Sequence, residues 1–314
     1  MEEFSLIQKI RTYCPENKRG LIIGNGDDAA VFTLPENQEI VICADSLVEN
    51  VHFTRAWASL FDIGWKAIAV NFSDLAAMGA SPYGVLLNLA IPRKMSETDV
   101  EDLYHGIGSC LRQYDAILLG GDTIAVEEYL SLAVTAVGSI EKGKALPRSG
   151  AKVGDQVIIT RKLGDAAAAW SLWQQGEVVP AHMEQAHLRP TPALEDGYQL
   201  LTLGAHAAND ISDGLASELG EIAAASRKRI CVNHESLYRS SLERYAKHSS
   251  QVWDWILYGG EDYGLVATLP KGIEIPSAWR VIGEVQEGHG VYLRDEHGRE
   301  TLLEPRGYNH FQRR

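Results

Sequence analysis

Residues 65–91 read WKAIAVNFSDLAAMGASPYGVLLNLAI, a helical pattern followed at once by a strand pattern. Gly79 ends the helical part, and residues 83–91 form the apolar run that is typical of a buried strand. Four apolar residues recur in the helical part at steps of three and four, which is the spacing of one helix face: Trp65, Ile68, Phe72 and Leu75. The stretch therefore predicts a mixed α/β fold.

The same alternation of helix and strand patterns extends on both sides of this stretch. Residues 1–13 predict a short amphipathic helix carrying Phe4, Ile7 and Ile10, and the central helix should span residues 58–78. A further helix is expected over residues 96–114, where Ser96 could cap its first turn. Strands are predicted at residues 28–34, 39–44, 116–119 and 131–139.

A polar, turn-rich segment at residues 146–155 predicts a domain boundary, so we expect domains over residues 1–146 and 147–314. A length of 314 residues agrees with two domains that each bury a core. Beyond the boundary the pattern predicts a strand at residues 156–160, helices at 165–175 and 214–226, and strands at 263–269, 279–282 and 291–294.

Composition excludes several classes of protein. The net charge of −13 argues against a nucleic-acid surface, although a divalent cation could still join phosphorylated ligands to carboxylates. No apolar run approaches the roughly 20 residues that a membrane-spanning helix needs, and the acidic start lacks signal-peptide features. The four cysteines lie far apart, which favours free thiols in a reducing cytoplasm: Cys14, Cys43, Cys110 and Cys231.

Carboxylates are concentrated in turns of small residues. Glycine neighbours allow close approach to the backbone, and clustered hard oxygen ligands suit Mg²⁺ together with the phosphates of a substrate. Six apolar runs end in such a turn, and we call these segments the six acidic turns: residues 26–28, 44–46, 73–75, 120–122, 210–214 and 259–262. Together they predict a magnesium-dependent site for a phosphorylated ligand.

Each acidic turn also has a purely structural interpretation. Gly-Asp is a common turn dipeptide, and Ser212 and Asp213 could equally be N-caps of the helix that follows. Asp74 is harder to explain structurally, because the helix macrodipole disfavours an anion near the C-terminal end. A nearby cation would offset that cost. Six such turns in one chain favour the functional interpretation.

Several familiar motifs are absent or misleading. Residues 24–29 read GNGDDA and formally satisfy the dinucleotide fingerprint, but a strand pattern ending at Pro35 follows instead of a helix. Asp27 and Asp28 would also face the phosphates. The sequence lacks a P-loop, the protein-kinase signatures and the G-x-S-x-G motif of serine hydrolases. Any nucleotide is therefore held in another way.

The acidic turns and their neighbours, taken in order, resemble the thiamine-monophosphate kinase family. This family belongs to the superfamily of aminoimidazole ribonucleotide synthetase, selenophosphate synthetase and a hydrogenase-maturation protein. The matching strings are GDDAAV (26–31), ADSLVENVHF (44–53), KAIAVNFSDLAAMGA (66–80), LGGDT (119–123), RSGAKVGD (148–155), DISDGL (210–215), GGEDY (259–263) and GYNHF (307–311). They extend over almost the whole chain.

The resemblance implies transfer of the ATP γ-phosphoryl group to thiamine monophosphate, with Asp28 and Asp210 as the residues expected to carry catalysis. It implies several Mg²⁺ ions held by Asp28, Asp45, Asp74, Asp122, Asp210 and Asp213. The ATP contacts would come from Gly121, Asp122, Arg148, Ser212 and Tyr104. The thiamine phosphate would be bound by His52, Glu261 and Tyr308.

The family fold implies an N-terminal α/β domain whose sheet pairs with its twin in a homodimer, and a C-terminal α/β domain that completes the cleft. One departure concerns Cys43 and Ala44, since the family usually has hydroxyl residues there. Side-chain ligands are lost at both positions, although a backbone carbonyl could still serve.

The residue inventory agrees with phosphoryl transfer, which needs positioning and charge neutralisation more than a covalent nucleophile. The acceptor is already an ionised phosphate, and its cationic thiazolium suits an aromatic face such as Tyr308 beside a carboxylate such as Glu261. Three alternatives stay open: another ATP-dependent enzyme of the superfamily, a metal-dependent phosphohydrolase, and a non-catalytic Mg²⁺-nucleotide sensor.

Overall fold

The computed structural model describes residues 8–237 and 241–308, and the chain forms two compact units. The first unit comprises Met1–Leu75 and Ala80–Lys144, and the second comprises Ala76–Gly79 and Ala145–Arg314. Of the predicted N-terminal helix, residues 8–11 are helical and Ile10 is buried, whereas Phe4 and Ile7 lie outside the described residues.

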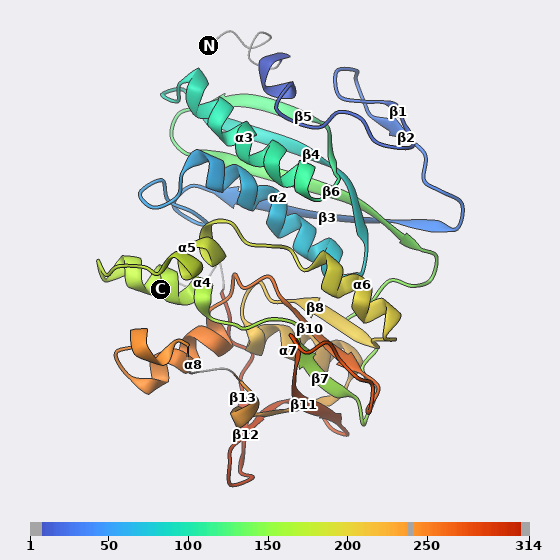
Figure 1. The fold of residues 1–314 in the computed structure, drawn as a ribbon, viewed down its shortest axis with the longest axis vertical. Helices are drawn as coiled ribbons and strands as arrows, with labels where there is room; N and C mark the ends of the chain where they lie inside the picture. Colours follow the sequence, from blue (N-terminus) through green and yellow to red (C-terminus); the bar gives the residue numbers. More distant parts are fainter. Residues whose placement is uncertain (1–7, 238–240, 309–314) are drawn as a thin grey trace. The chain divides into compact units, whose positions relative to one another are not determined.

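A four-stranded mixed sheet forms the centre of the first unit (Figure 1), in the order β3-β6-β4-β5. Strands β4 and β5 are parallel, and the other neighbouring pairs are antiparallel. The strand bounds are β3, Gln38–Val48; β4, Ser81–Pro92; β5, Ile117–Val126; and β6, Ser131–Glu141. A mixed sheet with helices agrees with the predicted fold class.

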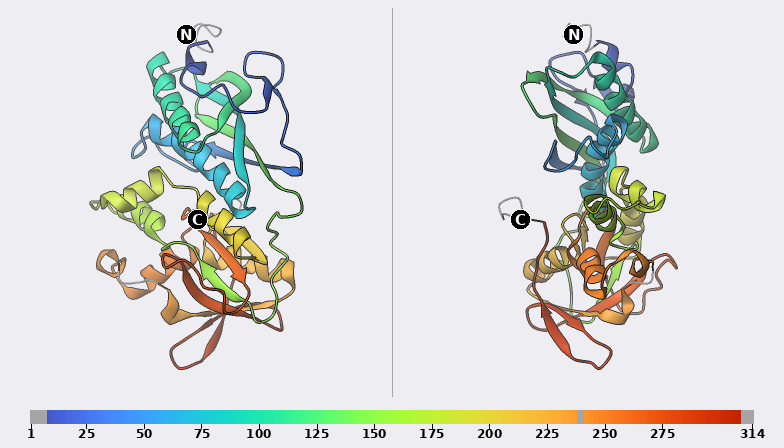
Figure 2. Two further views of the ribbon diagram at one scale, coloured as in Figure 1. Left: turned by 45° about the vertical axis from the view of Figure 1, so that its right-hand side comes forward. Right: turned by 90° about the vertical axis from the view of Figure 1, so that its left-hand side faces the viewer.

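Helices α2 (Leu60–Ala77) and α3 (Glu97–Gln113) both lie on one face of this sheet (Figures 1 and 2). The predicted apolar face of α2 is confirmed, because Ile68, Phe72 and Leu75 are fully buried. A Cβ atom at Gly64 would lie 2.1 Å from the Leu103 carbonyl oxygen. The absence of that side chain therefore lets the two helices approach closely.

None of the helices of the first unit that the structure describes lies over the opposite face of the sheet (Figure 2). Side chains on this face alternate along each strand with those under the helices, as expected for a sheet covered on one side. Four large apolar residues on it are exposed, and we call this surface the open sheet face: Ile40 (55%), Ile42 (63%), Leu86 (41%) and Ile124 (53%).

Residues 24–29 are not helical. They connect β1 (Leu21–Ile23) to β2 (Val31–Phe32), and these two strands form a small antiparallel hairpin. The exclusion of a dinucleotide-binding motif at this position is therefore confirmed, because no helix N-terminus is available there to face a pyrophosphate.

A seven-stranded sheet forms the second unit, in the order β13-β12-β9-β11-β7-β10-β8. All its neighbouring strands are antiparallel except β9 and β12. The strand bounds are β7, Gln156–Ile159; β8, Ala207–Asp210; β9, Arg229–Asn233; β10, Leu265–Leu269; β11, Arg280–Gln286; β12, Gly290–Arg294; and β13, Glu300–Leu303.

Helices bury both faces of this sheet. One apolar cluster joins α4 (Asp165–Gln174), α7 (Leu215–Ser226) and α8 (Ser249–Tyr258), and another packs around α6 (Leu194–Thr202). Helix α5 (Ala181–Leu188) packs against α4. No helix among the described residues is long and apolar enough to cross a membrane.

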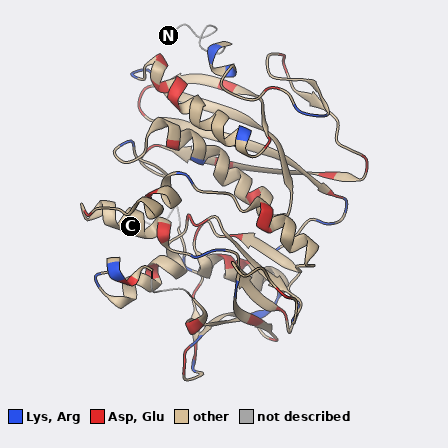
Figure 3. Cartoon of the chain, viewed as in Figure 1, with Lys and Arg blue, Asp and Glu red and all other residues tan. Residues whose placement is uncertain are grey.

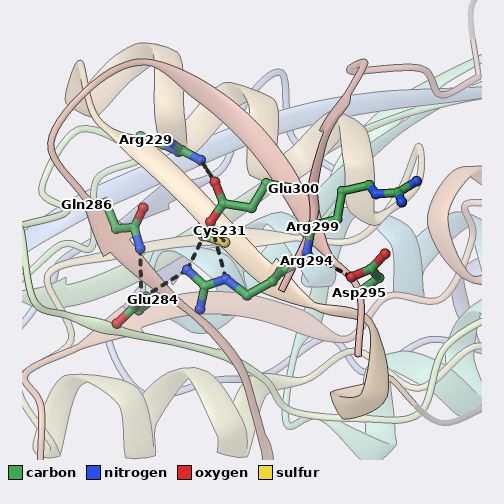
Figure 4. Close-up of polar contacts among 8 residues, drawn as sticks. All are labelled: Arg229, Cys231, Glu284, Gln286, Arg294, Asp295, Arg299 and Glu300. Carbon is green, nitrogen blue, oxygen red and sulfur yellow. Dashed lines mark hydrogen bonds and ion pairs between the residues drawn. The ribbon is translucent and has the colours of Figure 1, made fainter. Parts of the chain in front are cut away.

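Ion pairs cover the β9–β13 end of this sheet (Figure 4). Glu300 accepts hydrogen bonds from Arg229 and from Arg294, whose Nη2 lies 3.0 Å from Oε1. Such solvated pairs contribute little to stability, and this network contains none of the predicted site residues. Acidic side chains also occur throughout both units (Figure 3).

Candidate active site

The acidic turn at residues 210–214 begins at the end of β8. Asp210 is the last residue of β8 and is buried, and the turn leads into α7. The N-cap of α7 is Gly214, which has a φ of 121° and no side-chain capping bond. The interpretation of Ser212 and Asp213 as N-caps is therefore wrong, because Gly214 occupies that position.

A loop at residues 259–263 is joined to this turn through the backbone. The Glu261 N–H donates to the Ser212 carbonyl at 2.7 Å, and the Tyr263 N–H donates to the Ile211 carbonyl at 2.9 Å. A Cβ atom at Gly260 would lie 2.5 Å from the Ser212 carbonyl oxygen, so only glycine permits this approach. The structure thus brings Glu261 beside Ser212.

The C-terminal segment reaches the same turn. The Tyr308 N–H donates to the Asp213 carbonyl at 3.2 Å. A Cβ atom at Gly307 would lie 2.7 Å from that carbonyl oxygen. Ser212, Asp213, Glu261 and Tyr308, which lie in three separate sequence strings, are therefore neighbours in the folded chain.

Negative charge is concentrated beneath this turn. The pKa of Glu218 is raised to about 8, mainly by burial and also by the nearby Asp210, Glu221 and Asp213, although the hydrogen bond from the Asp213 N–H lowers it. The Glu218 side chain also accepts the Asp213 N–H at 3.1 Å. Sequence reasoning missed Glu218, whose only signal was its place in the first turn of α7. Carboxylates held this close disfavour one another's ionisation.

Arg148 connects to the same carboxylates through Asn209. The Arg148 Nε donates to Asn209 Oδ1 at 3.0 Å and lies 3.3 Å from Glu221 Oε2. The Asn209 Nδ2 donates to Glu218 Oε2 at 2.5 Å and to Glu221 Oε2 at 2.9 Å. Sequence reasoning also missed Asn209, a buried polar residue of β8 that directly precedes Asp210.

In the first unit, Asp45 and Asp74 lie on the side of the sheet that α2 covers. The Asp45 N–H donates to Asn71 Oδ1 at 3.0 Å. Asn71 and Asp74 are three residues apart on α2 and so share one helix face. This arrangement brings residues 44–46 and 73–75 together. Neither segment is a turn, because residues 44–46 lie within β3 and residues 73–75 within α2. Residues 120–122 likewise lie within β5, so the prediction of turns is wrong at these three places.

Asp122 lies on the other side of the sheet. It pairs with Asn88, and this row continues through Ala133 to Ser46 on β3. Asp45 belongs to the adjacent row with Val134, so its side chain points to the opposite face from that of Asp122. Two strands also separate β3 from β5, which corresponds to roughly 14 Å at the usual strand spacing.

Gly121 and Tyr104 lie near Asp122. A Cβ atom at Gly121 would lie only 1.9 Å from the Leu87 carbonyl oxygen, so the parallel pairing of β4 and β5 requires glycine there. Tyr104 on α3 is buried and hydrogen bonds to Thr123, the residue after Asp122. Burial raises the pKa of this phenol well above its usual value.

His52 and Asp28 occupy two further loops of the first unit. His52 Nδ1 accepts the Val48 N–H at 3.0 Å, which places the proton of the neutral ring on Nε2. Asp28 is exposed in the connection between β1 and β2, and its N–H donates to Asp27 Oδ1 at 3.0 Å.

No group of three or more His, Cys, Asp or Glu side chains that could hold a metal ion occurs within residues 8–237 and 241–308. The chemistry of the predicted ligands nevertheless fits Mg²⁺, since all six are carboxylates. Asp210, Glu221 and Asp213 lie close enough to Glu218 to add to the effect of burial on its pKa, and a cation would relieve this repulsion.

Comparison with known proteins defines the class first. Residues 26–140 match the family described as AIR synthase related protein, N-terminal domain. The thiamine-monophosphate kinase of Bacillus subtilis (strain 168) is 37% identical over 337 aligned residues, which cover 99% of this chain and 100% of that protein. The chain belongs to the thiamine-monophosphate kinase family.

Solved structures agree with this assignment. The crystal structure of thiamine-monophosphate kinase from Stenotrophomonas maltophilia K279a has a TM-score of 0.82 and 38% identity, covering 93% of this chain and 96% of that one. AaThiL complexed with AMPPCP and TMP has a TM-score of 0.79 and 32% identity, covering 98% and 97%. The resemblance inferred from the sequence strings is thereby confirmed.

Proposed function

We propose that this chain transfers the γ-phosphoryl group of ATP to thiamine monophosphate, forming thiamine diphosphate and ADP. The observation that carries the proposal is the similarity over 98% of the chain to AaThiL, which was solved with AMPPCP and TMP. AMPPCP is an ATP analogue whose γ-phosphoryl group cannot be transferred, and TMP in a kinase of this family corresponds to thiamine monophosphate. Residues 1–146 would bind Mg-ATP, and the enzyme would act in the cytoplasm.

The nucleotide would be held by Gly121, Asp122, Arg148, Ser212 and Tyr104. The guanidinium of Arg148 suits a phosphate, because its planar fork donates two parallel hydrogen bonds to oxygen. The contacts of Arg148 with Asn209 and Glu221 support this role, since they fix its orientation before a ligand arrives.

The thiamine phosphate would be held by His52, Glu261 and Tyr308. The neutral tautomer of His52 presents Nε2–H as a donor for a phosphate oxygen, because its Nδ1 already accepts the Val48 N–H. Glu261 and Tyr308 would offer a carboxylate and an aromatic face to the cationic thiazolium. Their common attachment to the turn at Ser212 and Asp213 supports this pairing.

Several Mg²⁺ ions would be held by Asp28, Asp45, Asp74, Asp122, Asp210 and Asp213. Mg²⁺ keeps its oxygen ligands at about 2.1 Å. Asp45 and Asp122 of one copy therefore cannot share an ion. They lie on opposite faces of the sheet, and two strands lie between β3 and β5. This separation supports more than one ion.

Catalysis would be a direct in-line transfer in which Asp28 and Asp210 act at the reacting phosphates. Bound Mg²⁺ supplies charge neutralisation on the β- and γ-phosphates. The protein residues orient the two substrates and exclude water from the transfer. No strong base is needed, because the acceptor oxygen is ionised near neutral pH.

The active form would be a homodimer in which two open sheet faces pack together. Exposed apolar side chains gathered on one face of a sheet are typical of an interaction surface. Ile40, Ile42, Leu86 and Ile124 on this face support the proposal.

Phosphorus NMR of the protein with Mg-ATP and thiamine monophosphate tests the function, with each substrate omitted in turn. Signals of a diphosphate ester and ADP that require both substrates are the expected result. Orthophosphate formed without thiamine monophosphate would indicate a phosphohydrolase instead. Unchanged spectra together with ATP binding would indicate a nucleotide sensor.

A further inference from the structure

Helix α5 places one buried histidine against the proposed substrate carboxylate. His187 Nδ1 lies 3.0 Å from Glu261 Oε2, and the His187 side chain is 8% exposed whereas that of Glu261 is 29% exposed. This approach is an ion-pair contact that lacks the geometry of a hydrogen bond, so it attracts the carboxylate when the ring is protonated. Neither the acidic turns nor the matching strings contain His187.

Two tryptophans of α4 hold the His187 ring. The Trp170 ring lies parallel to it at a centroid distance of 6.0 Å, and the Trp173 ring is edge-on at 5.3 Å. A ring confined on two sides has few rotamers, so the direction of Nδ1 is fixed by the packing of α4 against α5.

The backbone of Glu261 is fixed independently. Its φ is +58°, its N–H donates to Ser212, and Gly260 leaves no space for a Cβ atom on that side. Asp262 accepts the Gly164 N–H with both carboxylate oxygens, at 2.9 and 3.0 Å, which ties the loop to the start of α4. The contact with His187 is then one of the interactions that orient the Glu261 side chain.

We propose that His187 is a positioning residue, which orients the Glu261 carboxylate for the cationic ring of thiamine monophosphate. This inference rests on the proposed function. A long carboxylate side chain loses rotamer entropy when it binds a ligand, and the contact with His187 removes that cost before binding. The α4–α5 pair thereby contributes to substrate affinity through His187.

The test compares three variants with the full-length wild type by steady-state kinetics. His187→Leu removes the polar ring, whereas His187→Asn retains an N–H group close to the position of Nδ1. The matched control is His206→Leu, because His206 Nδ1 also lies beside a carboxylate oxygen, Asp155 Oδ2 at 2.9 Å, outside the proposed binding residues.

We expect His187→Leu to raise the KM for thiamine monophosphate about tenfold, with the KM for ATP and kcat within about twofold of wild type. His187→Asn should recover most of this loss, and His206→Leu should leave both KM values unchanged even if its Tm falls. Combining His187→Leu with Glu261→Gln should add little to the effect of Glu261→Gln alone.

Equal increases in both KM values, no recovery in His187→Asn, or additive effects with Glu261→Gln would each overturn the inference. Such results would leave the proposed function intact, provided that wild type forms the diphosphate ester. A wild type that forms none would overturn the proposed function itself, whatever the variants show. Calorimetric titration with thiamine monophosphate in the absence of ATP measures binding without turnover, and it should rank the variants in the same order of affinity.

Discussion

Glu261 and Tyr263 have φ values of 58° and 49°, in the left-handed region that side chains rarely adopt. Each such residue costs of order 1–3 kcal/mol, so the surrounding contacts must compensate. Backbone bonds to Ser212 and Ile211 and the Asp262–Gly164 contact provide that compensation. At the scale of residues, the candidate site is therefore built from an unusual backbone as much as from its side chains.

The close approach at Gly260 predicts the effect of a single methyl group. Gly260→Ala should lower stability by about 1–3 kcal/mol, because φ is +71° and the new Cβ atom would contact the Ser212 carbonyl. It should also raise the KM for thiamine monophosphate by displacing Glu261. Thermal denaturation and kinetics measure both effects.

Gly272→Ala is the matched control, since Gly272 has a φ of +86° but nothing within 4 Å of its ideal Cβ position. The control variant places a side chain at a positive φ, but its new Cβ atom contacts no neighbouring atom. Equal losses of stability in the two variants, or an unchanged KM in Gly260→Ala, would contradict the prediction.

Asp262 makes stability depend on pH. Burial raises its pKa well above the ordinary value, so the native state binds a proton that the unfolded chain releases. Stability therefore falls as pH rises from the unfolded pKa towards the native one. Asp262→Asn cannot ionise, and its Tm relative to wild type should increase steadily as pH rises above about 4.

Asp254→Asn provides the control for this series, because Asp254 is an exposed residue of α8. Its Tm difference from wild type should stay nearly constant with pH. A constant difference for Asp262→Asn as well would show that the buried carboxyl group does not control this dependence.

Sequence patterns identified individual residues only where these carry a local signal. Asp213, Glu261 and Tyr308 stand beside glycines and Ser212 is two residues from Gly214, and the structure brings these four residues together. Glu218, Asn209 and His187 have no such signal, since their importance comes from partners far away in the chain. Patterns of single residues do not contain the distances between segments, because the packing of the whole chain determines these distances.

At the scale of elements, α3 shows how local chemistry fixes a helix end. Ser96 accepts the Asp99 N–H at 3.2 Å, and Asp99 accepts the Ser96 N–H at 2.8 Å, which is a complete capping box. The predicted cap is thus confirmed. Ser96→Ala should cost about 1 kcal/mol of unfolding free energy.

Chemical denaturation measures this loss, with Ser109→Ala in the interior of the same helix as control. Alanine is favourable at an interior position, so Ser109→Ala should be neutral or slightly stabilising. A neutral Ser96→Ala variant would show that tertiary packing alone holds the start of α3.

Strongly periodic elements were predictable, and short ones were not. The pattern over residues 58–78 gives α2, and the apolar run at 83–91 gives β4. Strand β8 has the sequence AAND, with no β-branched residue, and neither it nor β9 was predicted. Helix α5 ends at Leu188 and α6 begins at Leu194, on either side of Pro190 and Pro192, and neither helix was predicted. Tertiary packing, which local propensity does not contain, forms these elements.

At the scale of the whole molecule, the open sheet face predicts the state of assembly. Ile42→Glu should convert the proposed dimer into monomers, because burying an unpaired carboxylate in an apolar interface is strongly unfavourable. Ile22→Glu is the matched control, since Ile22 on β1 is equally exposed at 63% but lies outside this sheet.

Sedimentation velocity at micromolar concentration distinguishes the outcomes. The wild type and Ile22→Glu should sediment as dimers and Ile42→Glu as a monomer. A monomeric wild type, or a dimeric Ile42→Glu variant, would exclude the open sheet face as the contact.

Backbone hydrogen bonds join three segments: the turn after β8, the loop at residues 259–263 and the segment ending at Tyr308. These hydrogen bonds do not depend on which side chains the segments have, except at glycines where there is no room for a Cβ atom. Substitutions at positions 261 and 308 can thus change which phosphate acceptor binds, while the backbone hydrogen bonds between the three segments are kept. Laboratory evolution towards other phosphate acceptors should start from these two positions.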